Sequence, residues 1–451
     1  MRTAAQPPAG AATTAAGAGD GSASGEGVLR GRWWRAGAWV GLFALAVVLP
    51  LLRQQGVAPW DVPWAEDAVL YYGDATTDGV STVLRGYDGY LQLAPRVLML
   101  PAAALPVAWM PAYAAVCAAI LTAALAAYVF RSTAGWIATT PFRLLVAAFV
   151  VIGPATAWET TGNLTNLIWP LLSALPWVVV SNRRSRADLV VRGVIAAVAP
   201  LSNLLAAIFL PLALVVSRRR RRLDARVVAG AMTAGVLAQA VAMVFASERH
   251  AATASSVAGL YRTVSVNVLG SFLVGERYLP ELWVRFGLAV GIVATVVTAT
   301  VFLALLWDAA PRSRAIAAVF VVAAALVACA PLVANGTDRT DPVTGTPPVP
   351  VERYVVVPVL YLVAAAALLA DPPDASRRRT VARVARPLLV VHSACVVLVS
   401  FAVTNPRSAA PRWEDELRLA RARCGAGAAE AVLDVAPPGW FLTLPCDEIT
   451  G

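Results

Sequence analysis

Long apolar runs alternate with short polar segments from residue 36 to residue 403. About 20 apolar residues suffice for a helix to cross the hydrocarbon core of a bilayer. The pattern therefore predicts an all-α polytopic transmembrane bundle of about eleven spans. The first run covers residues 36–52, and the others are centred near residues 120, 149, 174, 194, 210, 237, 296, 324, 362 and 395.

Two of these runs, residues 142–158 and 167–180, are short for an upright span. We interpret them as tilted segments or paired half-helices. The first run offers no small-residue cleavage site after Leu52, so we expect an uncleaved first helix rather than a signal peptide.

The polar ends of the chain suggest three parts. Residues 1–28 are rich in Ala, Gly, Ser and Thr and have no apolar period, which is typical of a disordered tail, here cytoplasmic. Residues 29–403 form the predicted transmembrane domain. Residues 404–451 form a small extracytoplasmic C-terminal tail.

The composition excludes a water-soluble enzyme, because 59% of the residues are apolar and only 14% are charged. The net charge is +10, and all of the positively charged side chains at neutral pH are arginines. The arginines gather in short segments between apolar runs. That distribution is typical of cytoplasmic loops in a multi-pass plasma-membrane protein. We therefore expect membrane lipids, and no nucleic acid, as partners.

The arginine distribution also predicts the orientation. With the N-terminus inside, the cytoplasmic side carries a net charge of +16 and the outer side −6. The opposite orientation would place every dense arginine cluster outside, against the positive-inside rule. We therefore predict a cytoplasmic N-terminus, an outer C-terminus and a functional site on the outer side.

Acidic and aromatic residues are concentrated in the first outer loop, residues 53–98. Its Pro and Trp residues suit interfacial helices at headgroup depth. Glu66 and Asp67 follow them, and either carboxylate can remove a proton from an attacking hydroxyl if it comes within hydrogen-bond reach. We favour Asp67 as the base because it lies nearer the Tyr71–Tyr72 segment, although the alternative for both acids is a solvated loop position.

The same loop continues with the string GYDGYLQLAPR, in which two glycines around Tyr87 and Asp88 allow a tight turn. Arg96 stands at the head of an apolar run. It can either extend to lipid headgroups or bind a phosphate.

Two further outer segments carry candidate binding residues. Glu159, Asn163 and Asn166 lie in the string ETTGNLTN, where the amides can either bind sugar hydroxyls or cap and pack a helical turn. Arg353 and Tyr354 begin a late apolar run at the outer interface, where a guanidinium can bind a lipid phosphate or anchor the helix.

Cysteine usage agrees with an outer tail. Cys424 and Cys446 both lie beyond the last span, on the side where disulfides persist, and we expect them to pair. The chain has two histidines and no Cys-x-x-Cys spacing, so the sequence predicts no metal site, and a divalent metal stays an open possibility for the chemistry.

Five sequence features occur together: the acid pair in a long first outer loop, GYDGYLQLAPR, ETTGNLTNLIW, the ERY that opens a late helix, and the C-terminal WEDELRLARARC and PPGWFLTLPC strings. Together they resemble actinobacterial membrane proteins of the glycosyltransferase C superfamily. The resemblance covers most of the chain from Trp33 onwards and is one of architecture and sparse motifs. The acid pair reads Glu-Asp where many relatives show Asp-Glu or Asp-x-Asp.

The resemblance implies transfer of a sugar from a polyprenyl-phosphate donor to a cell-envelope glycan, lipid or protein acceptor at the outer face. It implies a first-loop acid as base, here Asp67 or Glu66, and a donor-phosphate role for Arg353 or Arg96. Other interpretations are a lipid-linked glycan polymerase or ligase, a transport-related protein, or a non-catalytic membrane protein.

The predicted orientation can be measured with reporter fusions. Fusions after residues 80, 222, 380 and 451 are expected to report outside, inside, inside and outside, because the arginine clusters stay cytoplasmic. A cytoplasmic reporter after residue 451 would contradict both the odd number of spans and the outer disulfide.

Overall fold

The computed structural model describes residues 23–154, 156, 159–182, 184–245, 256–335, 353–371 and 379–450. The chain divides into two compact units, residues 1–44 and residues 45–451. The described part of the first unit belongs to helix α1, Ala23–Leu51, which ends in the second unit. Residues 23–28 of the predicted disordered tail are therefore helical, and the rest of that tail lies outside the described residues.

The described residues are mostly helical, as the apolar pattern predicts. Within this described part of the chain, six helices are long and apolar enough to cross a bilayer, and five shorter apolar helices accompany them. The number of spans and the orientation stay predictions. The six long helices are Val107–Gly135, Leu223–Phe245, Val257–Val274, Leu288–Asp308, Pro311–Val333 and Arg353–Ala370.

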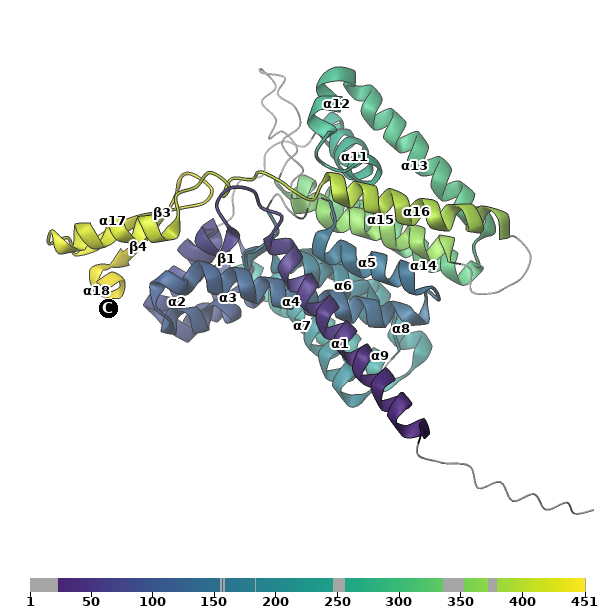
Figure 1. The fold of residues 1–451 in the computed structure, drawn as a ribbon, viewed down its shortest axis with the longest axis horizontal. Helices are drawn as coiled ribbons and strands as arrows, with labels where there is room; N and C mark the ends of the chain where they lie inside the picture. Colours follow the sequence, from purple (N-terminus) through teal and green to yellow (C-terminus); the bar gives the residue numbers. More distant parts are fainter. Residues whose placement is uncertain are drawn as a thin grey trace, which may run out of the picture. The chain divides into compact units, whose positions relative to one another are not determined.

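Among the described residues, thirteen α-helices lie between the first outer loop and the C-terminal tail, and most of them are labelled in Figure 1. They are α4 (Met110–Ser132), α5 (Thr140–Ile152), α6 (Ile168–Val180), α7 (Arg186–Ser202), α8 (Leu210–Arg220), α9 (Leu223–Phe245), α10 (Val257–Tyr261), α11 (Leu269–Val274), α12 (Leu279–Phe286), α13 (Leu288–Asp308), α14 (Pro311–Asn335), α15 (Val356–Ala370) and α16 (Arg379–Val399).

The core of the second unit surrounds α6 and α15, which are buried along their whole lengths. Both helices are apolar on every side, as expected of helices enclosed by other helices. Helix α15 packs against α5, α6, α13, α14 and α16. The Tyr361 hydroxyl, on α15, donates to the Leu172 carbonyl at 2.6 Å, so this buried polar group is satisfied.

Two predicted apolar runs form short helices, and one further helical segment lies outside the predicted runs. The short apolar runs predicted at residues 142–158 and 167–180 are short helices, α5 and α6, of 13 residues each. Residues 257–274, in contrast, lie between the apolar runs predicted near residues 237 and 296, and they form a continuous apolar helical segment. Its middle, Arg262–Val268, is a π-helix, a wider turn that interrupts the regular α-helical spacing.

The first outer loop folds into short helices and one hairpin. Strands β1 (Gly86–Tyr87) and β2 (Tyr90–Leu91) pair through a two-residue turn at Asp88-Gly89, where both residues have positive φ. This is the turn chemistry that Asp-Gly favours, and the tight turn predicted there is present. The helical pieces of the loop are η1 (Pro59–Asp61), η2 (Asp67–Tyr72), α2 (Gly73–Asp78), η3 (Gly79–Leu84) and α3 (Leu93–Met99). Two further pieces, η4 (Leu100–Ala104) and η5 (Val107–Trp109), lead from the loop to α4.

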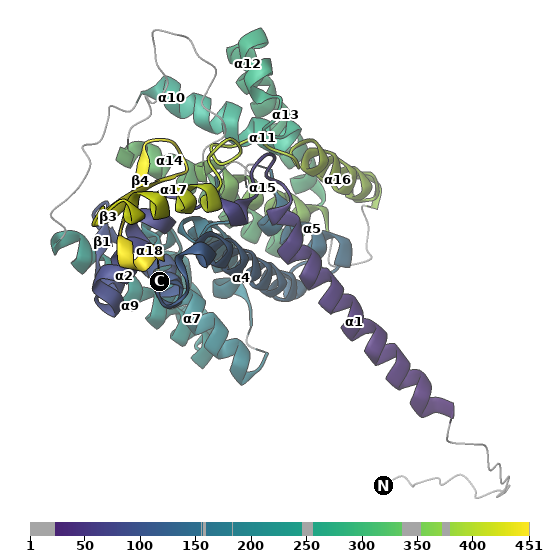
Figure 2. The same ribbon diagram turned by 60° about the vertical axis from the view of Figure 1, so that its left-hand side comes forward.

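The C-terminal tail is a folded module beside the first outer loop (Figure 2). Its elements are α17 (Trp413–Gly425), the antiparallel pair β3 (Glu430–Val435) and β4 (Trp440–Pro445), and α18 (Cys446–Thr450). Alternate residues of both strands are buried, and they share one apolar core with Tyr71 and Tyr72 of the loop. The module and the loop therefore stabilise each other.

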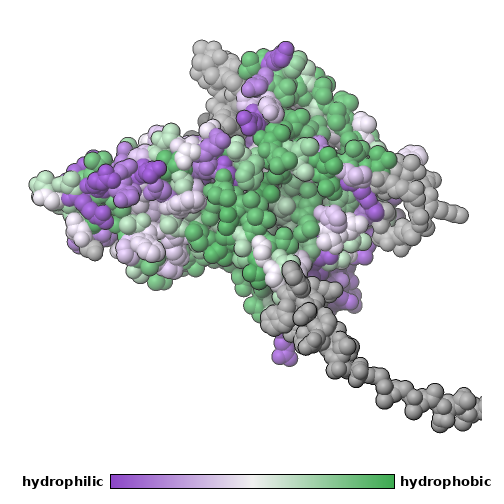
Figure 3. Space-filling model, in the orientation of Figure 1, coloured by the Kyte–Doolittle hydropathy of each residue, from purple (hydrophilic) through white to green (hydrophobic). Residues whose placement is uncertain are grey.

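Surface hydropathy separates these parts. Figure 3 shows hydrophobic residues over the helices and mostly hydrophilic residues over the C-terminal module. Large apolar side chains are exposed on α9, α13 and α16, for example Leu237, Ile292 and Leu388. Such extended apolar exposure suits contact with lipid chains.

The predicted Cys424–Cys446 disulfide is present and joins the end of α17 to the start of α18 across 22 positions. Replacing both cysteines by serine should lower the stability of the module by about 3 kcal/mol, because the cross-link restricts its unfolded state. Hydrogen exchange at residues 430–445 should become faster in this variant, whereas Cys395→Ser, at an exposed unpaired cysteine, should exchange like the wild type. Unchanged exchange without the disulfide would contradict a stabilising role.

Candidate functional site

A cavity of about 560 Å³ lies between the first outer loop, residues 165–169 at the start of α6, residues 203–208 after α7, helices α9 and α14, and Arg353 and Tyr354, which precede α15. Its volume falls in the range of small-molecule sites. Every segment that lines it belongs to the side that the arginine distribution predicts to be outside. The polar lining residues are Glu66, Tyr87, Asp88, Tyr90, Gln92, Thr165, Asn166, Asn203, Arg353 and Tyr354.

Two carboxylates surround one guanidinium at this cavity. Arg353 donates from Nη1 to Glu159 Oε1 at 2.9 Å, and the same nitrogen lies 3.9 Å from Glu66 Oε1. Glu66 is only 8% exposed, and its second oxygen, Oε2, has no hydrogen-bond partner among the described residues. Burial raises the pKa of Glu66, and the positive charge of Arg353 opposes that rise. The arrangement holds a partly desolvated carboxylate with one free oxygen beside a fixed positive charge.

Asp67 occupies a different position from its neighbour. It is 1% exposed, and its carboxylate accepts hydrogen bonds from the backbone of Leu164 at 2.7 Å and from the backbone and hydroxyl of Thr165 at 2.8 and 2.5 Å. These bonds cap the start of η7 (Thr165–Leu167), which leads into α6. Burial raises the pKa of Asp67, and these hydrogen bonds act in the opposite direction. The geometry therefore suits a structural role for Asp67 and leaves Glu66 as the acid that lines the cavity.

The two amides of the ETTGNLTN string organise their own turn. Asn163 donates to the Glu159 carbonyl at 2.6 Å and accepts from the Asn166 backbone at 2.9 Å. Asn166 also accepts from the Trp169 indole at 2.9 Å, and the Trp169 ring meets Tyr354 edge to face. Asn163 thus follows the capping alternative, while Asn166 both packs the turn and lines the cavity.

The β1–β2 hairpin brings Tyr87 and Asp88 to the cavity, and it is fixed from α9. Gln239 accepts from the Leu91 backbone amide at 3.3 Å and donates to the Leu91 carbonyl at 3.2 Å. Arg96 lies apart from this site. It is buried within the first outer loop, pairs with Asp74 at 2.7 Å and stacks over Tyr71, so it follows neither of the two expected alternatives.

An apolar groove of about 430 Å³ adjoins the cavity between α8 and α14. Ile208 lines both, and Leu326 of the groove lies one helical turn from Ala330 of the cavity on α14. The groove extends from Leu326 to Ala315, about 16 Å at 1.5 Å per residue. All of its lining side chains are apolar: Ile208, Phe209, Pro211, Leu212, Val215, Ala315, Ala318, Val319, Val322, Ala323 and Leu326.

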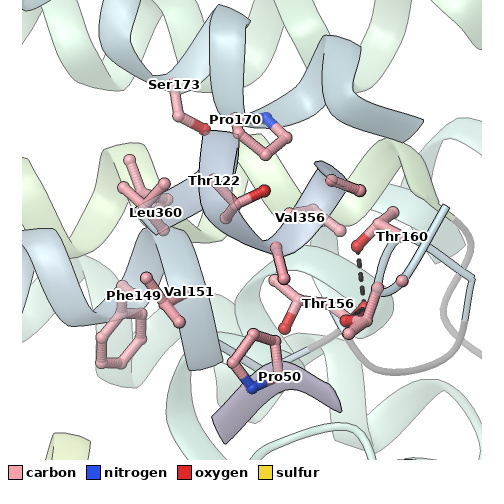
Figure 4. A pocket seen from close by; sticks show the side chains of 15 residues that line it. Pro50, Thr122, Phe149, Val151, Thr156, Thr160, Pro170, Ser173, Val356 and Leu360 are labelled. Carbon is pink, nitrogen blue, oxygen red and sulfur yellow. Dashed lines mark hydrogen bonds between the residues drawn. The ribbon is translucent and has the colours of Figure 1, made fainter. Parts of the chain in front are cut away.

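A second, much smaller cavity of about 20 Å³ lies between α4, α5, α6 and α15 (Figure 4). Its Thr156, Thr160 and Ser173 hydroxyls already donate to carbonyl oxygens of neighbouring residues. The space suffices for about one water molecule. It therefore offers no room for a substrate.

Two arginines for which the sequence predicts no role bind the loops around the site. Arg53 is fully buried and donates to the carbonyls of Gly153, Ser400 and Phe401 at 2.7–3.1 Å. Arg407 donates to the Thr161 and Gly162 carbonyls. Both side chains bond carbonyl oxygens of loops distant in sequence, a role that hydrophobic periodicity does not reveal.

Among the described residues, no group of three or more His, Cys, Asp or Glu side chains is placed to hold a metal ion. Comparisons with family models, curated proteins and solved structures find no match for this chain. Its function is therefore inferred from the residues and geometry of the cavity.

The role of Asp67 predicts a stability effect. Asp67→Asn should lower the free energy of unfolding by about 1–3 kcal/mol. The amide nitrogen of asparagine cannot accept the hydrogen bond that a backbone N–H now donates to one carboxylate oxygen. Thr165→Val, which removes only the hydroxyl donor, should cost less. Thermal unfolding in detergent measures both, and an unchanged midpoint for Asp67→Asn would contradict the capping role.

Proposed function

We propose that this chain is a membrane glycosyltransferase that moves a sugar from a polyprenyl-phosphate donor to a hydroxyl acceptor at the outer face of the plasma membrane. One observation carries the proposal: a cavity lined by carboxylates and a guanidinium adjoins an entirely apolar groove. Such a site fits an amphiphile with a polar head and a long apolar chain. The resemblance to the glycosyltransferase C superfamily supports the same chemistry.

Glu66 is the base in this proposal, in place of Asp67. The oxygen without a partner, Oε2, accepts the proton of the acceptor hydroxyl as that oxygen attacks the anomeric carbon of the donor sugar. The bond between the anomeric carbon and the phosphate oxygen breaks, and polyprenyl phosphate leaves with the electron pair. The products are the glycosylated acceptor, polyprenyl phosphate and a proton on Glu66.

Arg353 stabilises the leaving phosphate. A phosphodiester donor carries one negative charge and the departing phosphate monoester gains a second, so a nearby guanidinium interacts more strongly as the bond breaks. Glu159, at 2.9 Å, holds Arg353 in position before the ligand arrives. Tyr87 and Asp88 line the same cavity from the hairpin and contribute the binding surface for the sugar.

The base role predicts both a rate and a pH profile. Glu66→Gln should lower turnover by about 10²- to 10⁴-fold with little change in donor binding. In the wild type, kcat/KM should fall as the pH falls through the pKa of Glu66, because only the ionised carboxylate accepts a proton. Since burial raises that pKa, the fall should begin at a higher pH than for an exposed glutamate.

Glu159→Gln is the matched control, because it also removes a carboxylate beside Arg353. It should retain the acidic limb of the pH profile and lose far less activity than Glu66→Gln. The measurement is release of polyprenyl phosphate from a polyprenyl-phosphate sugar by purified protein. Equal activity of the Glu66 variant and the wild type would overturn the base assignment, and absence of turnover by the wild type would overturn the proposed function.

A further inference from the structure

Asn203 is a buried amide at the boundary between the cavity and the groove. It follows the end of α7, lines the cavity and is 7% exposed. Leu204 and Leu205, the next residues, line the apolar part of the cavity, and Ile208 lines both the cavity and the groove. Asn203 therefore lies where the lining changes from polar to apolar.

One hydrogen bond determines which atom of the Asn203 amide is the oxygen and which is the nitrogen. Its Oδ1 accepts from the backbone N–H of Leu205 at 3.0 Å and caps the helical segment η8, Leu204–Phe209. Only a carbonyl oxygen can accept that bond, so the amide nitrogen is the other atom. That nitrogen, Nδ2, is buried and has no partner among the described residues. Buried donors are nearly always paired, so a donor without a partner on a residue that lines a cavity is available to an acceptor on a bound molecule.

We propose that Nδ2 of Asn203 donates a hydrogen bond to a phosphate oxygen of the lipid donor. This inference rests on the proposed function. In a polyprenyl-phosphate sugar the phosphate lies between the polar sugar and the apolar chain. Asn203 likewise lies where the lining changes from polar to apolar, so it is placed to contact the phosphate. An amide N–H donates, and phosphate oxygens accept. Arg353, held by Glu159, supplies positive charge at the same cavity, and Asn203 Nδ2 adds a hydrogen-bond donor that has no partner among the described residues.

Two substitutions separate this role from capping. Asn203→Asp and Asn203→Ser both keep a side-chain oxygen of a type preferred at helix N-caps, and both remove the amide donor. The serine variant does so without adding a charge. The matched control is Asn182→Asp, because Asn182 accepts from Arg220 through Oδ1, an oxygen that aspartate retains.

Binding of polyprenyl phosphate and of the corresponding polyprenol is compared for purified protein in lipid nanodiscs. Both Asn203 variants should bind polyprenyl phosphate about 10- to 100-fold more weakly than the wild type, the range for loss of a hydrogen bond to a charged group. Polyprenol binding should be unchanged, since polyprenol lacks the phosphate. Asn182→Asp should bind both lipids as the wild type does.

Wild-type affinity for polyprenyl phosphate in Asn203→Ser would overturn the inference. So would displacement of polyprenyl phosphate by an equal concentration of inorganic phosphate, because the site would then recognise free phosphate. Asn203-dependent binding without consumption of any polyprenyl-phosphate sugar would overturn the proposed function and support this inference. Sugar transfer by a protein whose binding of polyprenyl phosphate is unaffected by the Asn203 substitutions would support the proposed function and overturn this inference.

Discussion

The buried carboxylate of Asp67 joins the first outer loop to the start of α6, and the rest of the site depends on that junction. A charge out of contact with water is tolerated only when it is fully hydrogen-bonded, and Asp67 receives three hydrogen bonds from Leu164 and Thr165. Because Asp67 is held there, the preceding residue, Glu66, lines the cavity beside Arg353. One carboxylate of the acid pair is hydrogen-bonded within the fold, and the other lines the cavity.

The C-terminal tail also contacts the residues around this junction. Two backbone hydrogen bonds, from Ala65 to Ala436 and from Ala436 to Pro63, fix the chain immediately before Glu66. Arg407 donates hydrogen bonds to carbonyls of the loop that precedes Leu164, and its positive charge opposes the rise in the pKa of Asp67 that burial causes. Residues of the first loop, the α5–α6 connection and the C-terminal tail therefore meet around one pair of acids, which links the stability of the tail to the geometry of the site.

The sequence predicted the parts of the structure that follow from local pattern. Apolar runs predicted helices, Asp88-Gly89 predicted a tight turn, and the two cysteines of the C-terminal tail predicted the disulfide. It did not separate Glu66 from Asp67, because adjacent residues differ only in which neighbour they meet after folding. Asn203 lies in an apolar stretch of the sequence without a motif, and only its unpaired side-chain nitrogen in the structure identifies it as a candidate binding residue. The helical segment at residues 257–274 was not among the predicted apolar runs.

The central claim is that the cavity and the groove hold a single amphiphilic ligand. A cryo-electron microscopy structure of the purified protein with saturating polyprenyl phosphate tests it most directly. The account predicts density for the phosphate in the cavity beside Arg353, continuous with density for the prenyl chain between α8 and α14. An empty cavity, or a lipid bound with its phosphate elsewhere on the outer face, would contradict it.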